Sequence, residues 1–545
     1  MEHPTAIANH TMSARFWVLA AAVGLLLVGA AFWGANKQAL GLFHDDGIYV
    51  VVAKSLSQGD GYRIISLPTA PPQTKYPFLY SYLLSWVWSL DRSFPENIVV
   101  LKSFNIAIFV AIFFVSVVFC RHHYSESRFA ALIFAIMICT NPMIFTFTDY
   151  VISDLLLVLF ALVALTICGF GANSAPFTLR VSLLAIVTGL ACLTRSAAVP
   201  LIVAGSVYVF TNRGWRGVGH FIAIVALIVA PWFIWVARRS VPAADSLFAY
   251  YTAYDFGRAG AGGVEAWMNQ QFTVIDGNAR YLSNSFELLY LTPLLPGLVF
   301  FLAGLTVVGV IESMRREDLA LWSFFLSSLG LLLVFPFHPG RYVAPLIPVL
   351  ILFLFRGAKA VAGRIESTAA AQSPIGLLGK IAWCPVALIF ILNGVWLSGY
   401  LLVHDDQTMR GLYGSHVPYS WRGFDESFAW IRHHAPAEAL LATAYDPMYY
   451  LYTGRQTIRP ALHRPATYFY PYAEAKPDVG TVDEIKPQLE KLKVKYLIVD
   501  PLDGFAEGKA TLKLLENLVR AYGDKAKNVF TSADGKHKIY ALTVD

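Results

Sequence analysis

The sequence has few charged residues and lacks the short motifs that mark many soluble enzymes. Only 14% of its 545 residues are charged, whereas soluble globular chains have about 25%. None of the five cysteines forms a CxxC pair or falls in a polar segment, which argues against a disulfide framework and a cysteine zinc site. The polar C-terminal part has no GxGxxG or GxxxxGK[ST] pattern, so no nucleotide site is expected there. No sequence motif calls for a cofactor or a metal, while a divalent ion held by Asp45 and Asp154 stays open as an alternative.

The sequence is instead rich in long apolar runs. Hydrophobic residues make up 56% of the chain, and the mean hydropathy is +0.54. Because about 20 apolar residues cross a bilayer, the runs predict a polytopic α-helical membrane protein with about eleven transmembrane helices. The expected spans are 16–33, 98–120, 129–147, 151–171, 180–194, 196–211, 218–236, 290–311, 319–336, 341–356 and 381–402.

Basic residues are unevenly distributed between the predicted loops. If the N-terminus is cytoplasmic, most Arg and Lys of the short loops lie inside, and little more than Arg195 and Arg341 lies outside. This asymmetry follows the positive-inside rule and accounts for the net charge of +6 without nucleic acid as a partner. An odd number of spans then places the C-terminal tail outside, and a bacterial inner membrane is the expected setting.

Three polar regions face the exterior in this topology: the loops 34–97 and 237–289 and the tail from about residue 403. The tail alternates strand-like and helix-like segments and includes a hairpin pattern, "NVFTSADGKHKIYALTV". We therefore expect two domains: a transmembrane module, 1–402, that includes both long loops, and an exterior α/β domain, 403–545.

The first exterior loop begins with two adjacent carboxylates, Asp45 and Asp46, in "HDDGIYVVVAKSLSQGDGY". Apolar residues from Ile48 to Leu56 recur with helical spacing, and Gly59 is placed to end the helix. Such a helix beside a membrane span would lie flat in the interface. The pair could cap this helix or face lipid headgroups; alternatively, one carboxylate could be a catalytic base beside a lipid-accessible cavity.

Several segments resemble, in order, those of GT-C glycosyltransferases of the protein O-mannosyltransferase and lipid A aminoarabinose transferase group. "HDDGIY" and "TKYPFLYSYLLS" resemble the first exterior loop of that group, with its D-D/E-x-x-Y pattern and "KPPLYYWL" stretch. Further similar segments are "TDYVISDLLLVLFALVAL", "GLACLTRSAAVPLI", "FPFHPGRYVAPLIPVLILF" and "YDPMYYLYTGRQTIRP". The chain departs from the group at Thr74-Lys75-Tyr76-Pro77, where Glu-Lys-Pro-Pro is frequent.

The resemblance implies transfer of a hexosyl or pentosyl group (class EC 2.4) from a polyprenyl-phosphate carrier to an acceptor on the exterior face. Asp45 would be the general base or would orient the acceptor, with Asp46 as its supporting carboxylate. Asp154 would be the second acidic site residue, and Asp149 is the alternative. The residues expected at the carrier phosphate are Lys75, Arg195 and Arg341. The acceptor could be a lipid, a protein or a polysaccharide.

Simpler roles remain open for several of these residues. Arg195 could be a structural partner of Asp154 or Asp149, and Arg341 could extend to lipid headgroups. His338 could transfer a proton or lie passively in its loop. At the level of the whole chain, the alternatives are a transporter or flippase for a lipid-linked substrate and a non-catalytic envelope assembly protein.

Overall fold

The structure is a computed structural model, and it describes most of the chain outside the long connections. The described residues are 13–124, 127–169, 176–239, 247–248, 251, 268, 271–280, 282, 296–315, 318–335, 340–368, 382–409, 421–462, 478–502 and 506–543. The second predicted exterior loop therefore lies largely outside the described residues. His338 lies outside them as well.

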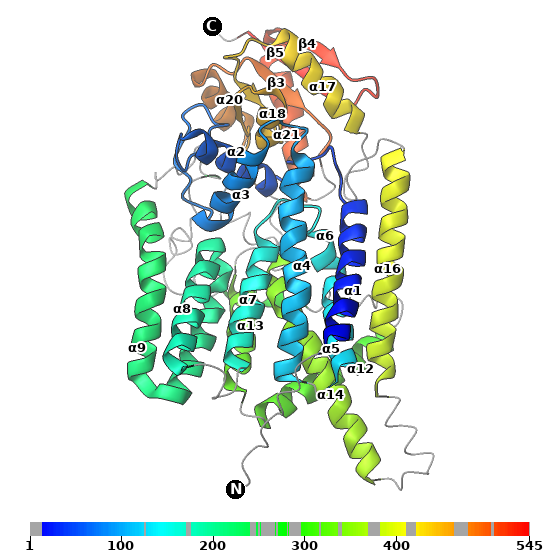
Figure 1. The fold of residues 1–545 in the computed structure, drawn as a ribbon. Helices are drawn as coiled ribbons and strands as arrows, with labels where there is room; N and C mark the ends of the chain where they lie inside the picture. The colour runs from blue at the N-terminus through cyan, green and yellow to red at the C-terminus, as the bar shows by residue number, and fades with distance from the viewer. Residues whose placement is uncertain are drawn as a thin grey trace.

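A bundle of apolar helices forms the body of the molecule, and an α/β domain covers one end of it (Figure 1). Among the described residues, six helical segments are long and apolar enough to cross a membrane, and four shorter apolar helices accompany them. The polytopic helical fold is thus as predicted, while the number of eleven spans stays a prediction. The bundle helices are α1 (Ala14–Trp33), α4 (Ile98–His123), α5 (Arg128–Cys139), α6 (Pro142–Thr146), α7 (Asp154–Gly169), α8 (Phe177–Thr194), α9 (Val199–Arg239), α12 (Pro296–Arg315), α13 (Leu319–Val334), α14 (Ile347–Thr368) and α16 (Cys384–Met409).

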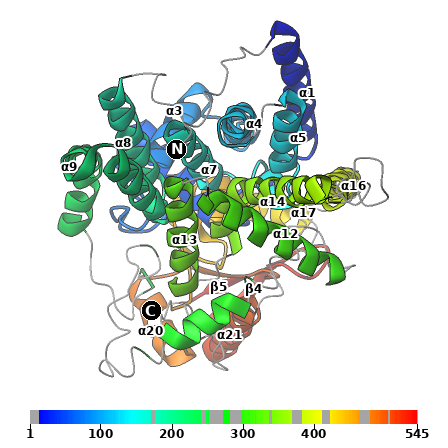
Figure 2. The ribbon, with the colours of Figure 1, turned by 90° about the horizontal axis from the view of Figure 1, so that it is seen from below.

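The helix α9 is a hairpin of two helices. Its backbone leaves the helical region at Gly214, where φ is 64° and ψ is −165°, a conformation that glycine adopts at little cost. A Cβ on Gly205 would lie 2.4 Å from the Phe221 ring, so the two halves pack closely against each other. The sequence predicts this division into two segments. Seen along the bundle, α9 and α8 lie at one side and α16 at another (Figure 2).

Two helices of the first loop, α2 (Asp45–Gln58) and α3 (Phe78–Leu90), lie between the bundle and the α/β domain (Figure 1). The predicted helix end at Gly59 is confirmed, with φ of 87° at this residue. However, α2 is not half exposed as a helix lying in the interface would be. Its residues 45–53 are all buried, because α3 and the α18 helix of the C-terminal domain (Asp446–Thr453) pack against it. We call this end of the bundle the domain-side end, and the opposite end the far end.

The C-terminal domain is built on a five-stranded mixed sheet with strand order β2-β1-β3-β5-β4. The strand β1 (Leu441–Ala442) runs parallel to β2 (Thr457–Ile458) and to β3 (Tyr496–Val499). The predicted hairpin is formed by β4 (Ala526–Thr531) and β5 (Lys538–Leu542), and β5 also pairs with β3. The helices of this domain are α17 (Trp421–His434), α18, α20 (Val482–Lys491) and α21 (Ala506–Tyr522). The predicted boundary between residues 402 and 403 falls inside α16.

Candidate active site

The domain-side end brings five of the six predicted site residues into one connected group. Asp45 starts α2, and Lys75 precedes α3. Asp154 starts α7, Arg195 follows α8, and Arg341 lies in the short helix η3 (Gly340–Leu346). The first residue of α7, Asp154, lies next to the end of α8, where Arg195 follows, so both charges lie at the domain-side end of the bundle. The sixth residue, Asp46, faces a different set of partners.

The Asp45 carboxylate is buried and receives two strong hydrogen bonds. The Tyr76 hydroxyl donates to Oδ1 at 2.5 Å, and the Arg341 guanidinium donates to Oδ2. Burial alone would raise the pKa of Asp45, but the Arg341 charge, the Tyr76 hydrogen bond and the Lys75 charge outweigh it. They hold the pKa of Asp45 well below its ordinary value, so the group is ionised.

Asp46 is turned toward the backbone that precedes α2. Its Oδ2 accepts the N–H of Gly41 at 2.9 Å, and its Oδ1 accepts the N–H of Gly47 at 2.8 Å. Burial raises the pKa of Asp46 to about 6, although both N–H groups favour the charged form. The N-cap position of α2 belongs to His44, which makes no side-chain cap hydrogen bond. Neither Asp45 nor Asp46 is thus the N-cap residue; both lie in the first turn of α2, where Asp46 accepts the N–H of Gly47.

Arg195 and Asp154 form the second charged pair of the site. Nη1 of Arg195 donates to Oδ2 of Asp154 at 2.6 Å, and both side chains are buried. The Arg195 guanidinium lies over the Tyr342 ring at 4.7 Å, and the Arg341 guanidinium lies 5.6 Å from the same ring. The Tyr342 ring therefore holds the two arginines close together despite their like charge.

The contacts of Asp149, Lys75 and Arg341 decide between the roles that the sequence left open for them. Asp149 accepts from Lys102 Nζ at 2.7 Å and from the Asn36 N–H at 2.7 Å, so it ties α4 to the segment after α1. Lys75 is buried, lies 5.6 Å from the Tyr76 ring and acts electrostatically on Asp45. Arg341 pairs with Asp45 rather than extending to a membrane surface.

One guanidinium nitrogen of the site has no protein partner. Nη1 of Arg341 is buried and makes no hydrogen bond with any of the residues that the structure describes. A buried donor without a partner costs about 1–3 kcal/mol, and at a charged group it marks a place where an anion can bind. This nitrogen belongs to the residue that also holds Asp45.

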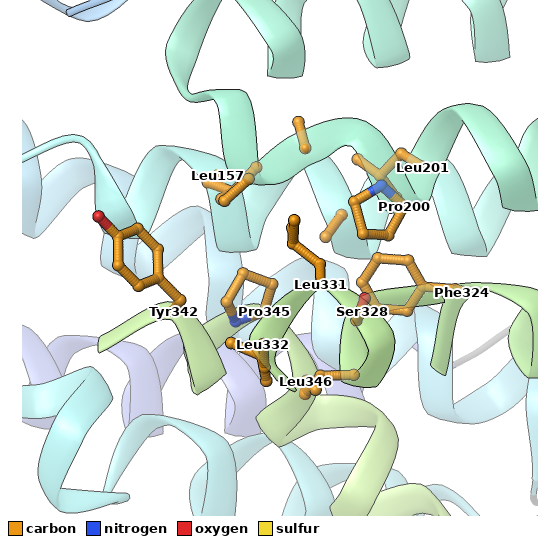
Figure 3. Close-up of a pocket in the computed structure, with 13 residues that line it drawn as sticks. Leu157, Pro200, Leu201, Phe324, Ser328, Leu331, Leu332, Tyr342, Pro345 and Leu346 are labelled. Atoms are coloured by element: carbon orange, nitrogen blue, oxygen red, sulfur yellow. The ribbon is translucent and has the colours of Figure 1, made fainter. Parts of the chain in front are cut away.

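A small apolar cavity lies between α7, α9, α13 and η3 and is lined by Tyr342, whose ring contacts both arginines. Figure 3 shows Leu157, Pro200 and Leu331 around it, with Tyr342 at one edge and its hydroxyl directed away from them. Tyr342 thus contributes one face to the cavity while its ring also contacts Arg195. The site therefore combines a charged part and a hydrocarbon-like part that share one side chain.

Sequence reasoning missed three aromatic members of the site. Tyr76 donates to Asp45, Tyr342 contacts both arginines, and Tyr49 shares a 2.8 Å hydrogen bond with Ser153. Tyr76 had a usable signal, since it stands where the resembled group often has proline. Tyr342 directly follows Arg341 in the resembled segment "FPFHPGRYVAPLIPVLILF", and Tyr49 is the tyrosine of the D-D/E-x-x-Y pattern; neither was predicted as a site residue. No cluster of three or more His, Cys, Asp or Glu suited to a metal ion occurs among the described residues.

Among the comparisons with known proteins, the one with solved structures bears on the fold. No family model matches the chain, and no curated protein matches it in sequence. Solved structures do match: the architecture is that of GT-C membrane glycosyltransferases, as predicted.

Two of these structures show how far the likeness extends. ArnT from Cupriavidus metallidurans bound to undecaprenyl phosphate matches with a TM-score of 0.57 and 16% identity over 98% of this chain and 99% of that one. The oligosaccharyltransferase AglB from Archaeoglobus fulgidus, in complex with an inhibitory peptide and a dolichol phosphate, matches with a TM-score of 0.53 and 13% identity. That match covers 97% of this chain and 75% of that one.

Proposed function

We propose that the chain is an integral membrane glycosyltransferase that moves a sugar from a polyprenyl-phosphate carrier to an acceptor. The proposal is supported above all by the buried Nη1 of Arg341, which has no partner among the described residues and lies at the carboxylate proposed as the base. A carrier phosphate is an anion that a guanidinium binds well. The fold shared with ArnT and AglB supports the same carrier class.

The charges of the site suit a phosphodiester. Three basic side chains, Lys75, Arg195 and Arg341, face two carboxyl groups, Asp45 and Asp154. One positive charge is left over, and a sugar-phosphate-polyprenyl diester carries one negative charge. The apolar side chains around the cavity beside Tyr342 would contact the start of the isoprene chain, and the remainder of the chain would lie among the membrane lipids.

The reaction we propose is an inverting displacement at the anomeric carbon. The acceptor oxygen or nitrogen forms the new bond as the bond to the phosphate oxygen breaks, and Asp45 accepts the acceptor proton. Polyprenyl phosphate leaves with the electron pair of the broken bond. Arg195 and Arg341 stabilise the negative charge that grows on this phosphate, and Asp154 orients Arg195 through their 2.6 Å pair.

Binding of the donor would also activate Asp45. With Arg341 and Tyr76 as partners, Asp45 is a poor base, because its pKa is held well below the ordinary value. A donor phosphate that binds the Arg341 guanidinium would weaken the ion pair between Arg341 and Asp45. The pKa of Asp45 would then rise. The base would thus become effective only when the sugar is in place.

The proposed setting is a bacterial inner membrane, with a cytoplasmic N-terminus and a periplasmic C-terminal domain. The distribution of basic residues between the loops supports it. A single cysteine at the exposed position Lys527, in a chain otherwise free of cysteine, tests it. Labelling of intact cells by a maleimide that reaches the periplasm but not the cytoplasm is expected; labelling only after lysis would reverse the orientation.

Mass spectrometry of lipid extracts tests the function itself. A strain that lacks the chain is expected to accumulate a polyprenyl-phosphate-linked sugar, and membranes that contain the chain should consume it and release polyprenyl phosphate. Movement of the intact lipid-linked sugar across the membrane, without release of the carrier, would instead support a flippase. Normal lipid-linked sugars in the deletion strain would support an assembly protein.

A further inference from the structure

The C-terminal domain contacts the loop that carries Asp45 through the helix α18. Asp446, the first residue of α18, is fully buried, and its Oδ1 accepts from Nε2 of His44 at 2.8 Å. His44 directly precedes Asp45. We infer that Asp446 is a positioning residue, which holds His44 and thereby fixes Asp45 in the reacting geometry. This inference rests on the proposed transferase function.

The backbone of His44 needs such support. Its φ is 63° and its ψ is −56°, a region that residues with a side chain rarely occupy. Conformations of this kind cost about 1–3 kcal/mol and persist only where the surroundings impose them. The start of α2, and with it the direction of the Asp45 side chain, depends on this residue.

Asp446 in turn depends on His44. The carboxylate is buried, and its second oxygen, Oδ2, has no hydrogen-bond partner among the residues that the structure describes. His44 is therefore the side-chain partner that the structure shows for it. A buried carboxylate that loses such a partner is strongly destabilised, so the two residues are expected to be coupled energetically.

The next two residues of α18, Pro447 and Met448, pack tightly against the same loop. A Cβ on Gly47 would lie 2.7 Å from Pro447 Cβ, and a Cβ on Gly41 would lie 2.7 Å from Met448 Cβ. These two glycines donate the N–H groups that hold Asp46. The C-terminal domain thus packs against one side of the loop. On the other side, Arg341 of the bundle pairs with Asp45. This arrangement gives the domain a part in the chemistry itself.

Three variants of the full-length protein test the inference. His44→Leu removes the ring donor, whereas His44→Gln places an amide nitrogen near the position of Nε2 and meets the same backbone. Gln456→Met is the matched control, since Gln456 Nε2 joins the same domain to the Leu67 carbonyl of the same loop, outside α2. The measurements are consumption of the accumulated lipid-linked sugar, affinity for undecaprenyl phosphate, thermal stability, and hydrogen exchange of amides 46–49.

His44→Leu is expected to lower the transfer rate by about 10- to 100-fold, while affinity for undecaprenyl phosphate stays within the wild-type range. Exchange at 46–49 should accelerate in this variant, and His44→Gln should restore most of both properties. Equal losses in His44→Leu and His44→Gln, or equal losses in Gln456→Met, would reduce the pair to a structural contact and overturn the inference. If the wild-type chain transfers no sugar, the proposed function fails, and the exchange of 46–49 still decides whether the pair holds the start of α2.

Discussion

The two ends of the helix bundle both bury charged side chains, but they use them differently. At the far end, Arg356 of α14 donates to Ser313 Oγ at 2.7 Å, to the His123 carbonyl at 2.5 Å and to Asp318 at 3.2 Å. At the domain-side end, Arg341 donates to Asp45 and keeps a buried Nη1 without a partner among the described residues. The far-end arginine is engaged by three helices or loops, while the domain-side arginine pairs with the Asp45 carboxylate and contacts Tyr342, which lines the apolar cavity.

Histidine adds to the far-end network. His123 Nδ1 lies 3.1 Å from Asp318 Oδ2, and His123 Nε2 lies 2.9 Å from the Leu165 carbonyl. Burial alone would raise the pKa of Asp318, but His123 and Arg356 lower it to about 2. The cluster therefore joins α4, α7 and α14. The comparison shows that a buried charge alone does not mark a ligand-binding site. At the domain-side end, the buried charge also has a donor without a protein partner among the described residues and an apolar cavity close by.

The largest expected effect comes from removing the proposed base. Asp45→Asn should lower sugar transfer by about 10²- to 10⁴-fold, because the amide cannot accept the acceptor proton. Binding of undecaprenyl phosphate should become tighter, since Arg341 is released from its carboxylate partner. Both quantities can be measured in membranes and by titration of the purified protein.

The control for this variant is Asp149→Asn. Asp149 bonds to Lys102 and the Asn36 N–H, so the change alters structure and leaves the proposed base in place. Transfer in Asp45→Asn at the level of Asp149→Asn would contradict the assignment of Asp45.

A smaller effect is expected from the arginine with the unfilled donor. Arg341→Gln should lower the transfer rate by about 10²- to 10³-fold and weaken undecaprenyl phosphate binding, opposite to the effect of Asp45→Asn. Arg341→Lys should restore little of the transfer rate, because the ammonium of lysine cannot form the two parallel hydrogen bonds that a planar guanidinium forms with a phosphate. Arg422→Gln is the control, since Arg422 is exposed on α17 and pairs with Glu426. Unchanged phosphate affinity in Arg341→Gln would place the carrier elsewhere.

The charged members of the site could be predicted from the sequence, while their surroundings could not. Asp45, Arg195 and Arg341 stand out because charge is costly beside long apolar runs. Tyr342 lies in one of the resembled segments, but nothing in that segment predicts that its ring contacts both arginines. The His44–Asp446 pair joins residues 402 positions apart, a contact that no local pattern encodes. For the same reason the sequence overestimates the exposure of α2, since its cover comes from distant α18.

Asp46 is expected to shift stability with pH more than it shifts catalysis. Its pKa in the folded protein is raised to about 6, above the value of an unfolded aspartate, so folding favours its protonated form. The stability that this provides is fully present below about pH 4 and is lost as the pH rises to about 6, by about 3 kcal/mol. Asp45 titrates below this window, because its pKa is lowered.

Thermal unfolding in detergent between pH 4 and pH 6 measures this effect. The wild-type protein should lose stability across the window, and Asp46→Asn should flatten the dependence. A dependence that is unchanged in Asp46→Asn would assign the titration to another group.

The smallest effect on transfer is expected at the far end, where the comparison is sharpest. Asp318→Asn removes the charge that His123 and Arg356 share, and breaking a buried ion pair in this way costs about 3–5 kcal/mol. The variant should therefore melt at a lower temperature, while the transfer rate per folded molecule and the affinity for undecaprenyl phosphate stay at wild-type values. Because the cluster joins α4, α7 and α14 away from Tyr342 and its cavity, a loss of transfer beyond the loss of folded protein would mean that the two ends are coupled through the helices. In that case the division of the bundle into a structural end and a catalytic end would be wrong.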